Sequence, residues 1–142
     1  MIVLDTNVVS ELMRPAPSEA VLDWMARHPA ARLFLSAVSE AELRMGVALL
    51  PAGRRREALR EAVDAMIAED FAGRVLPFDS AAARTCAEIA SEGRAAGRPI
   101  SQFDCQLAAI ARARGAAMAT RNVADFDGCG IAVIDPWAEG GG

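Results

Sequence analysis

Four acidic residues occupy positions from which their carboxylates can converge in a parallel α/β fold. They are Asp5, Glu42, Asp104 and Asp125. The first directly follows an aliphatic run, the last follows an apolar run after a short turn, and the other two stand near expected helix starts. In parallel α/β sheets, ligands bind outside the carboxyl ends of the strands. We therefore expect the four carboxylates to meet at one edge of a sheet.

A hard divalent cation is the ligand that such a group of acids favours. Close carboxylates repel one another unless some are protonated or a cation joins them. Mg²⁺ takes oxygen ligands, keeps several waters, and is usually held by one or two carboxylates together with substrate phosphate. The lone His28 precedes Pro29 in an expected loop, far in sequence from the acids. We therefore predict Mg²⁺ or Mn²⁺ as cofactor, and no Ser-His-Asp or Cys-His hydrolase, because no residue provides the base.

Helix capping is the alternative role for three of these acids. Ser39-x-x-Glu42 and Ser101-x-x-Asp104 both have the spacing of a capping box, in which a serine begins the helix and an acid follows in the first turn. The helix dipole also favours acids at these positions, and Asp5 could cap the helix that follows it. Each acid taken singly is open to either role, but four acids at one edge favour a shared cation.

Short apolar runs alternate with longer segments of helical pattern along the chain. We predict strands at residues 2–4, 33–35, 75–76, 116–119 and 131–134. Helices are expected at residues 8–13, 18–27, 39–50, 54–70, 80–95 and 102–114. This alternation indicates a parallel sheet with helices on both faces. The predicted fold class is α/β, a three-layer α/β/α domain with a central parallel sheet of about five strands.

A single domain accounts for nearly the whole chain of 142 residues, of which 53% are hydrophobic. That content supports one core, and we assign residues 1–138 to the domain. Residues 139–142 are expected to form a disordered tail, because the glycines at 140–142 can neither pack nor restrict the backbone. The first residues carry acids instead of a basic leader, and no run of 18 or more apolar residues occurs. We therefore expect a cytoplasmic protein that does not enter the membrane.

The cysteines do not indicate a disulfide framework or a zinc site. Cys86, Cys105 and Cys129 are odd in number and widely spaced, and no CxxC pair occurs. Zinc sites and disulfide frameworks have paired cysteines at characteristic spacings. We expect buried, reduced thiols.

The charge balance is unusual for a protein that acts on nucleic acid. The net charge is −4 and all 15 basic residues are arginines, whereas phosphate binding normally draws on a basic surface. Bound cations or a positively charged partner would have to change the local sign. Arg54, Arg55, Arg56 and Arg60 form the one obvious basic cluster. Such a run is usually a solvated helix face, so we leave it out of the site.

Five motifs together give the chain a family resemblance. They are LDTNVVSEL at residues 4–12, SAVSEAELRMG at 36–46, ISQFDCQLAAIA at 100–111, ATRNVADF at 119–126 and IDPW at 134–137. In order and approximate spacing they resemble the PIN-domain ribonuclease toxins of the VapC family, particularly its FitB-like group. The resemblance runs from Met1 to about Trp137 and implies a PIN-like form of the predicted α/β domain.

The resemblance implies a metal-dependent endoribonuclease. Asp5, Glu42 and Asp104 stand at the motif positions of the family's acids. Near the TRNxxDF segment we choose Asp125 over the neutral Asn122 as the fourth acid. Hydrogen bonds that orient the carboxylates are expected from Thr6, Asn7, Thr120 and Asn122. A metal held by Asp5 and Asp104 would polarise the scissile phosphate and activate a water for in-line attack, with Glu42 and Asp125 completing the cluster.

The same resemblance implies partners. The chain would be the toxin of a type II, VapBC-like toxin–antitoxin system, held by a cognate VapB- or FitA-like antitoxin that blocks the acidic cleft. Operator DNA would be bound only through the antitoxin. A homodimer is also expected. The RNA substrate would present a single-stranded loop, because its bases can be splayed out for recognition.

Two alternatives keep the fold and change the activity. The chain could be a catalytically weak PIN-like binding partner of a DNA-binding antitoxin, or a DNA nuclease. Response-regulator receivers and haloacid-dehalogenase-like phosphatases are more distant alternatives, since both require a second acid close to the first. Here Asn7 occupies the place of the second acid of the dehalogenase-like enzymes, and the chain contains no lysine for a receiver.

Overall fold

The computed structural model describes residues 1–139, which form a parallel sheet of five strands. The strands are β1 (Ile2–Leu4), β2 (Leu33–Ser36), β3 (Val75–Leu76), β4 (Ala117–Ala119) and β5 (Val133–Ile134). Their order across the sheet is β3-β2-β1-β4-β5. The chain adds β2 and β3 on one side of β1 and then adds β4 and β5 on the other side. The strand order therefore reverses between β1 and β4. In open α/β sheets this reversal is where ligands bind.

The register of the two central strands brings two polar residues together at this reversal. Leu4 pairs with Ala119, and the Asp5 N–H donates to the Ala119 carbonyl at 2.9 Å. Asp5 and Thr120, the residues that follow β1 and β4, therefore leave the sheet side by side at its carboxyl edge.

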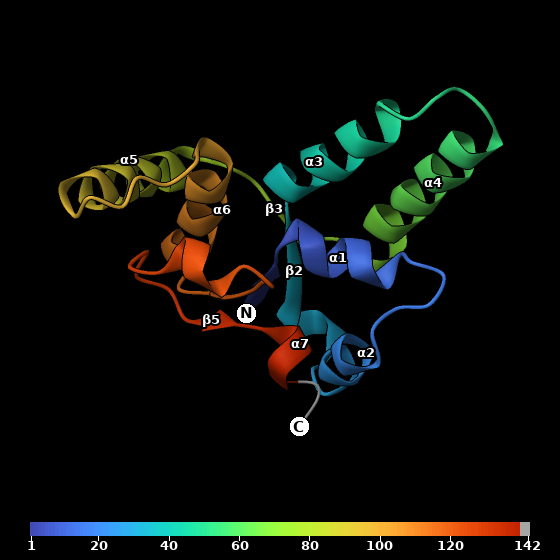
Figure 1. The fold of residues 1–142 in the computed structure, drawn as a ribbon, viewed down its shortest axis with the longest axis horizontal. Helices are drawn as coiled ribbons and strands as arrows, with labels where there is room; N and C mark the ends of the chain where they lie inside the picture. Colours follow the sequence, from blue (N-terminus) through green and yellow to red (C-terminus); the bar gives the residue numbers. More distant parts are fainter. Residues whose placement is uncertain (140–142) are drawn as a thin grey trace.

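Seven α-helices accompany the sheet within residues 1–139 (Figure 1). They are α1 (Thr6–Leu12), α2 (Glu19–Ala26), α3 (Ala37–Ala48), α4 (Arg54–Ala65), α5 (Ser80–Ala95), α6 (Gln102–Ala113) and α7 (Pro136–Glu139). Shorter turns are η1 (Ala30–Arg32), the π-helical η2 (Met66–Asp70) and η3 (Val123–Phe126). Helices α5 and α6 lie together on one side of the molecule, away from α1 and α2 (Figure 1).

The side chains of the central strands alternate between two apolar cores. Val3 and Met118 belong to the core shared with α5 and α6. Ile2 and Leu4 belong to the core shared with α1 and α2. Successive strand residues face opposite sides of a sheet, so helices cover both faces. The predicted three-layer α/β/α domain with a parallel sheet of about five strands is confirmed.

One of the two predicted capping boxes is wrong. Helix α3 begins at Ala37, and Ser36 caps it by accepting a hydrogen bond from the Ser39 N–H at 3.0 Å. Glu42 therefore lies in the second turn of α3 instead of the first. The extended Ser36 already supplies the cap oxygen, so the helix starts three residues earlier than the serine–glutamate spacing predicts.

The other two predicted caps are present. Ser101 caps α6 and accepts a hydrogen bond from the Asp104 N–H at 3.1 Å. Asp5 caps α1, and its Oδ1 accepts from the Thr6 N–H at 2.6 Å. Capping and a role at the sheet edge are therefore compatible, because in α6 the serine oxygen satisfies the backbone and leaves the Asp104 carboxylate free for other contacts.

Several predicted boundaries shift. The helix predicted at 54–70 ends as an α-helix at Ala65 and continues as the π-helical η2. The strand predicted at 131–134 contains only Val133–Ile134. The domain boundary at residue 138 stays a prediction, and residues 140–142 of the predicted tail lie outside the described residues.

The three cysteines are free thiols in the structure, and two of them are buried. Cys105 and Cys129 are buried, whereas Cys86 is half-buried. The Sγ atoms of Cys86 and Cys105 lie 3.1 Å apart and join α5 to α6 by a thiol contact. No helix within residues 1–139 has the length and apolar character needed to cross a membrane.

Candidate active site

The four predicted acids line one cavity at the carboxyl edge of the sheet. This acid cavity has a volume of ≈610 Å³. Asp5 reaches it from the end of β1, Glu42 from α3, Asp104 from the first turn of α6, and Asp125 from η3. Four segments that are distant in sequence therefore bring carboxylates to the point where the strand order reverses.

Asp5 is the most enclosed of the four acids, with 5% of its surface exposed. Its Oδ1 accepts from the Thr6 N–H, while its Oδ2 accepts from the Thr120 hydroxyl at 2.8 Å and from Asn7 Nδ2 at 3.4 Å. Burial raises the pKa of the Asp5 carboxyl; the hydrogen bonds oppose this shift, and the charges of Asp104 and Asp125 add to it. The carboxylate is thus held in one orientation but is costly to charge.

The residues around Asp5 form one hydrogen-bonded group. Thr120 Oγ1, which donates to Asp5, accepts from Asn7 Nδ2 at 3.4 Å and from the Asn122 N–H at 3.0 Å. Asn7 Oδ1 accepts from the Arg121 N–H at 3.3 Å. Asn7 and Thr120 thus contact Asp5 through their side chains, whereas Asn122 takes part through its backbone.

The Thr6 side chain behaves differently from the expectation. Only the backbone of Thr6 bonds Asp5. Its buried Oγ1 has no hydrogen-bond partner within residues 1–139 and belongs to a residue that lines the acid cavity. A polar atom buried in this way favours a further ligand or water in the cavity.

Glu42 and Asp104 are also affected by their acidic neighbours. Burial raises the pKa of Glu42, and the charges of Asp5 and Asp104 add to this. The Thr6 hydroxyl acts in the opposite direction, although its geometry does not meet that of a hydrogen bond. Burial also raises the pKa of Asp104; the Ser101 hydroxyl opposes this shift, and the charge of Asp125 adds to it. In the absence of a cation, the charges of these carboxylates therefore raise one another's pKa values.

The donor set of the acid cavity fits a hard divalent cation. Its acidic side chains provide oxygen donors, and neither His28 nor a cysteine lines it. Within residues 1–139, no group of three or more acidic, histidine or cysteine side chains is arranged to hold a metal ion by itself. This open arrangement suits Mg²⁺ or Mn²⁺, since Mg²⁺ commonly uses only one or two carboxylates and completes its shell with water and phosphate.

Six further residues line the acid cavity without a role assigned from the sequence: Ser10, Glu11, Arg14, Phe103, Arg121 and Trp137. Glu11 is buried, accepts from the Ser18 N–H at 3.0 Å and pairs with Arg14 at 3.2 Å. Arg121 lies over the Trp137 ring, with its Cζ 4.9 Å from the ring centroid. Arg121 lies within the ATRNVADF motif and Trp137 within the IDPW motif. Their contact depends on the packing of α7 beside the end of β4 and has no signal in the local sequence.

The residues excluded on sequence grounds lie elsewhere. His28 follows α2 and contacts the Trp24 ring, with the ring centroids 4.5 Å apart. In the basic cluster on α4, Arg60 is exposed and pairs with Glu57 at 2.7 Å and with Asp64 at 3.3 Å. These ion pairs are typical of a solvated helix face.

An open parallel α/β sheet with carboxylates at its strand reversal defines a class of protein suited to metal-assisted chemistry on anionic substrates.

The PIN domain family model matches residues 2–127. The chain is 44% identical to plasmid stability protein StbB of Pseudomonas syringae pv. tomato, over 96% of this chain and 99% of that protein. It is 42% identical to VapC ribonuclease Y4jK of Sinorhizobium fredii, over 96% and 98%. Toxin FitB of Neisseria gonorrhoeae is also 42% identical, over 96% and 99%.

Solved structures give the same relationship. The crystal structure of FitAcB from Neisseria gonorrhoeae contains a chain that matches with a TM-score of 0.91 and 42% identity, over 96% of this chain and 99% of that one. A chain in the structure of FitAB bound to an IR36 DNA fragment matches with a TM-score of 0.91 and 41% identity, over 96% of each chain. The chain therefore belongs to the PIN-domain family, within the group that contains VapC and FitB.

Proposed function

We propose that this protein is a metal-dependent endoribonuclease and the toxin of a type II, VapBC-like toxin–antitoxin system. The observation that carries the proposal is the convergence of Asp5, Glu42, Asp104 and Asp125 on one cavity. The similarity to a VapC ribonuclease over nearly the whole chain supports the ribonuclease activity, and the similarity to toxin FitB supports the toxin role.

The cofactor of the proposal is Mg²⁺ or Mn²⁺, held by Asp5 and Asp104 with Glu42 and Asp125 completing the cluster. When bound, the cation supplies the charge that polarises the scissile phosphate and makes water a better nucleophile. Burial is the main cause of the raised pKa values of Asp5, Glu42 and Asp104, and the charges of neighbouring acids add to it. A shared cation would favour the charged form of these carboxylates, which supports this assignment.

The protein's own residues orient the reactive groups. Thr120, Asn7 and the Thr6 N–H fix Asp5 in one rotamer, so little reorganisation is needed when substrate binds. Asp125 is exposed at the edge of the cavity, where its carboxylate is open to water and substrate. Arg121, held against Trp137, provides a cation beside the acids to offset the charge of an RNA phosphate.

The proposed partners are an RNA substrate with a single-stranded segment, a VapB- or FitA-like antitoxin, and a second copy of the chain. Operator DNA would be bound through the antitoxin, in keeping with the FitAB structure on a DNA fragment. A protein with this role acts in the cytoplasm and needs no membrane.

RNA cleavage by the purified protein tests the enzymatic part. With Mg²⁺ or Mn²⁺ the protein should cleave RNA, a chelator should abolish the activity, and Asp5→Asn should lower the rate by orders of magnitude with the fold intact. A single-stranded DNA of the same sequence is the matched substrate. Preferential DNA cleavage would identify a DNA nuclease instead, and equal RNA cleavage in excess chelator would overturn the mechanism.

Growth tests the biological part. Expression of this chain alone should slow growth, and co-expression of the cognate antitoxin should restore it. Asp5→Asn should be harmless while still binding the antitoxin. Normal growth with confirmed soluble protein, together with no complex between the two proteins, would contradict the toxin role and leave a catalytically weak binding protein.

A further inference from the structure

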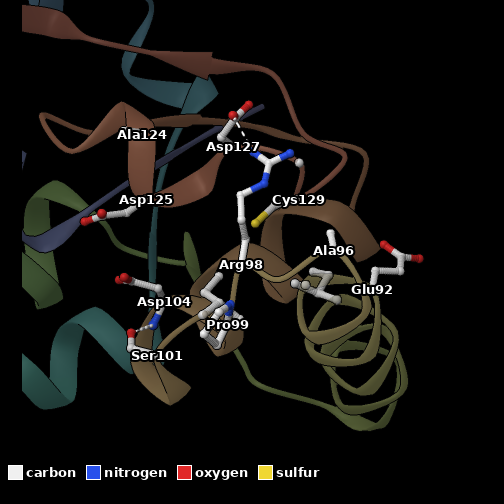
Figure 2. Close-up of a pocket in the computed structure, with 14 residues that line it drawn as sticks. Glu92, Ala96, Arg98, Pro99, Ser101, Asp104, Ala124, Asp125, Asp127 and Cys129 are labelled. Atoms are coloured by element: carbon white, nitrogen blue, oxygen red, sulfur yellow. Dashed lines mark hydrogen bonds and ion pairs between the residues drawn. The ribbon is translucent and has the colours of Figure 1, made fainter.

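A second cavity adjoins the acid cavity and shares Asp104 and Asp125 with it. This side cavity has a volume of ≈610 Å³ and lies between the end of α5, the start of α6 and the segment after η3. Figure 2 shows Asp104 and Asp125 at one end of it and Glu92 at the other. A polymer whose reacting group lies at the four acids can therefore continue directly into the side cavity.

Arg98 is the basic residue that lines the side cavity within the described chain. It extends from the segment between α5 and α6 toward Asp127, across the cavity (Figure 2), and its Nη1 lies 2.7 Å from Asp127 Oδ2. The two side chains are 63% and 73% exposed. Exposed ion pairs contribute little to stability, so the Arg98 guanidinium can exchange Asp127 for another oxyanion at small cost.

The remaining lining suits a base more than a second phosphate. Ile89, Pro99 and Ile100 provide apolar surface. Glu92, at the far end, is paired with Arg112 at 3.2 Å. The side cavity therefore offers one exchangeable cation and an apolar wall, with acidic side chains at both of its ends. Its volume is within the size range of cavities that hold small ligands.

A nucleotide of single-stranded RNA combines these two requirements. Its phosphate matches the guanidinium fork, which binds oxyanions through two parallel hydrogen bonds. Its base, unstacked in a single strand, can lie against apolar side chains. The shared walls at Asp104 and Asp125 place such a nucleotide next to the reacting phosphodiester in the same strand.

We propose that the side cavity binds the nucleotide adjacent to the scissile phosphodiester, with Arg98 holding a non-reacting phosphate in place of Asp127. This inference rests on the proposed endoribonuclease function. It assigns Arg98 a binding role and gives the protein a preference for substrates that extend past the cleaved bond on one side.

Steady-state cleavage of a single-stranded oligoribonucleotide with Mn²⁺ tests the proposal. Arg98→Ala should lower kcat/KM about tenfold, as expected for loss of a charge-assisted hydrogen bond, and Arg98→Lys should lower it less. The matched control is Arg94→Ala, which removes an exposed arginine from the last turn of α5 outside the side cavity and should leave kcat/KM unchanged.

Asp127→Asn separates binding from a purely structural ion pair. If Asp127 competes with RNA for Arg98, this variant should raise kcat/KM by up to about fivefold, the range expected for releasing an exposed pair. The gain should disappear when Arg98→Ala is added. If the pair serves only the fold, Arg98→Ala and Asp127→Asn should lower the melting temperature alike and affect kcat/KM in the same direction.

Substrates shortened one phosphate at a time from either end locate the contact. The penalty of Arg98→Ala should vanish when one particular phosphate is removed and persist for the other lengths. Cleavage by the wild type with equal kcat/KM for the Arg98→Ala and Arg94→Ala variants would overturn this inference alone. Absence of RNA cleavage by the wild type would overturn the proposed function, and the inference with it.

Discussion

Replacing Asp104 with asparagine should raise the melting temperature of the metal-free protein. Burial and then the charge of Asp125 raise the pKa of the Asp104 carboxyl. Burial raises the pKa values of Asp5 and Glu42, and the charge of Asp104 adds to both shifts. Charged Asp104 is therefore disfavoured by its surroundings when no cation is present. Asparagine keeps the size of the side chain and removes the charge.

The size of the effect follows from two opposing contributions. Where solvent reaches at least one of the two groups, as it does at Asp104, a charge–charge contact is worth about 0.2–1 kcal/mol because solvent screens it. Relief of the three contacts with Asp5, Glu42 and Asp125 should contribute roughly 1–2 kcal/mol. Loss of the interaction with the dipole of α6 subtracts about 0.3–1 kcal/mol, whereas the Ser101 cap remains. The net gain of about 1 kcal/mol corresponds to a rise of roughly 2–4 °C in melting temperature for a domain of this size.

Thermal unfolding in a chelator measures the metal-free melting temperature, and thermal unfolding with added Mn²⁺ measures the stabilisation by the cation. A cation present at a hundred times its Kd stabilises the wild type by about 2.7 kcal/mol, and Asp104→Asn should lose most of that gain. The control is Asp79→Asn, since Asp79 caps α5 by accepting from the Ala82 N–H at 2.9 Å outside the acid cavity. This variant should keep the Mn²⁺ response. A lower metal-free melting temperature for Asp104→Asn, with an unchanged Mn²⁺ response, would refute the reasoning and leave Asp104 with a role in the helix start only.

Two other predictions concern the same acids. The pKa values of Asp5, Glu42 and Asp104 stand above their ordinary values of 3.8 for aspartate and 4.5 for glutamate, so the folded metal-free protein binds protons more tightly than the unfolded chain. Its free energy of unfolding in urea should therefore increase from pH 7 toward about pH 5, with a smaller increase for Asp5→Asn; a decrease in the wild type relative to that variant would contradict this. Thr120→Val removes the hydroxyl that donates to Asp5 and should lower the rate of RNA cleavage about 10–100-fold. The control is Thr85→Val, because the Thr85 hydroxyl donates to the Ala81 carbonyl within α5. This variant should not change the cleavage rate. Equal activity of the two threonine variants would show that Thr120 does not position Asp5.

The amino-acid sequence by itself determined the order of the elements and where the acids fall along them. Aliphatic runs such as residues 2–4 and 75–76 form strands at the predicted positions, because their short apolar pattern can be buried on both sides of a parallel sheet. Asp5 follows a strand and Asp104 begins a helix, and parallel topology then requires both to lie at the same edge. These inferences depend on local pattern and on one general rule of sheet geometry.

The tertiary structure decided which serine caps a helix and which distant side chains meet, and the local sequence pattern leaves both open. Ser36 caps α3 while Ser39 is buried, and this choice follows from where β2 ends, not from the spacing to Glu42. The stacking of Arg121 on Trp137 and the ion pair of Arg98 with Asp127 join segments that meet only after the helices have packed. Contacts of this kind depend on how whole helices and strands are placed relative to one another. Hydrophobic periodicity and motif spacing therefore do not predict them.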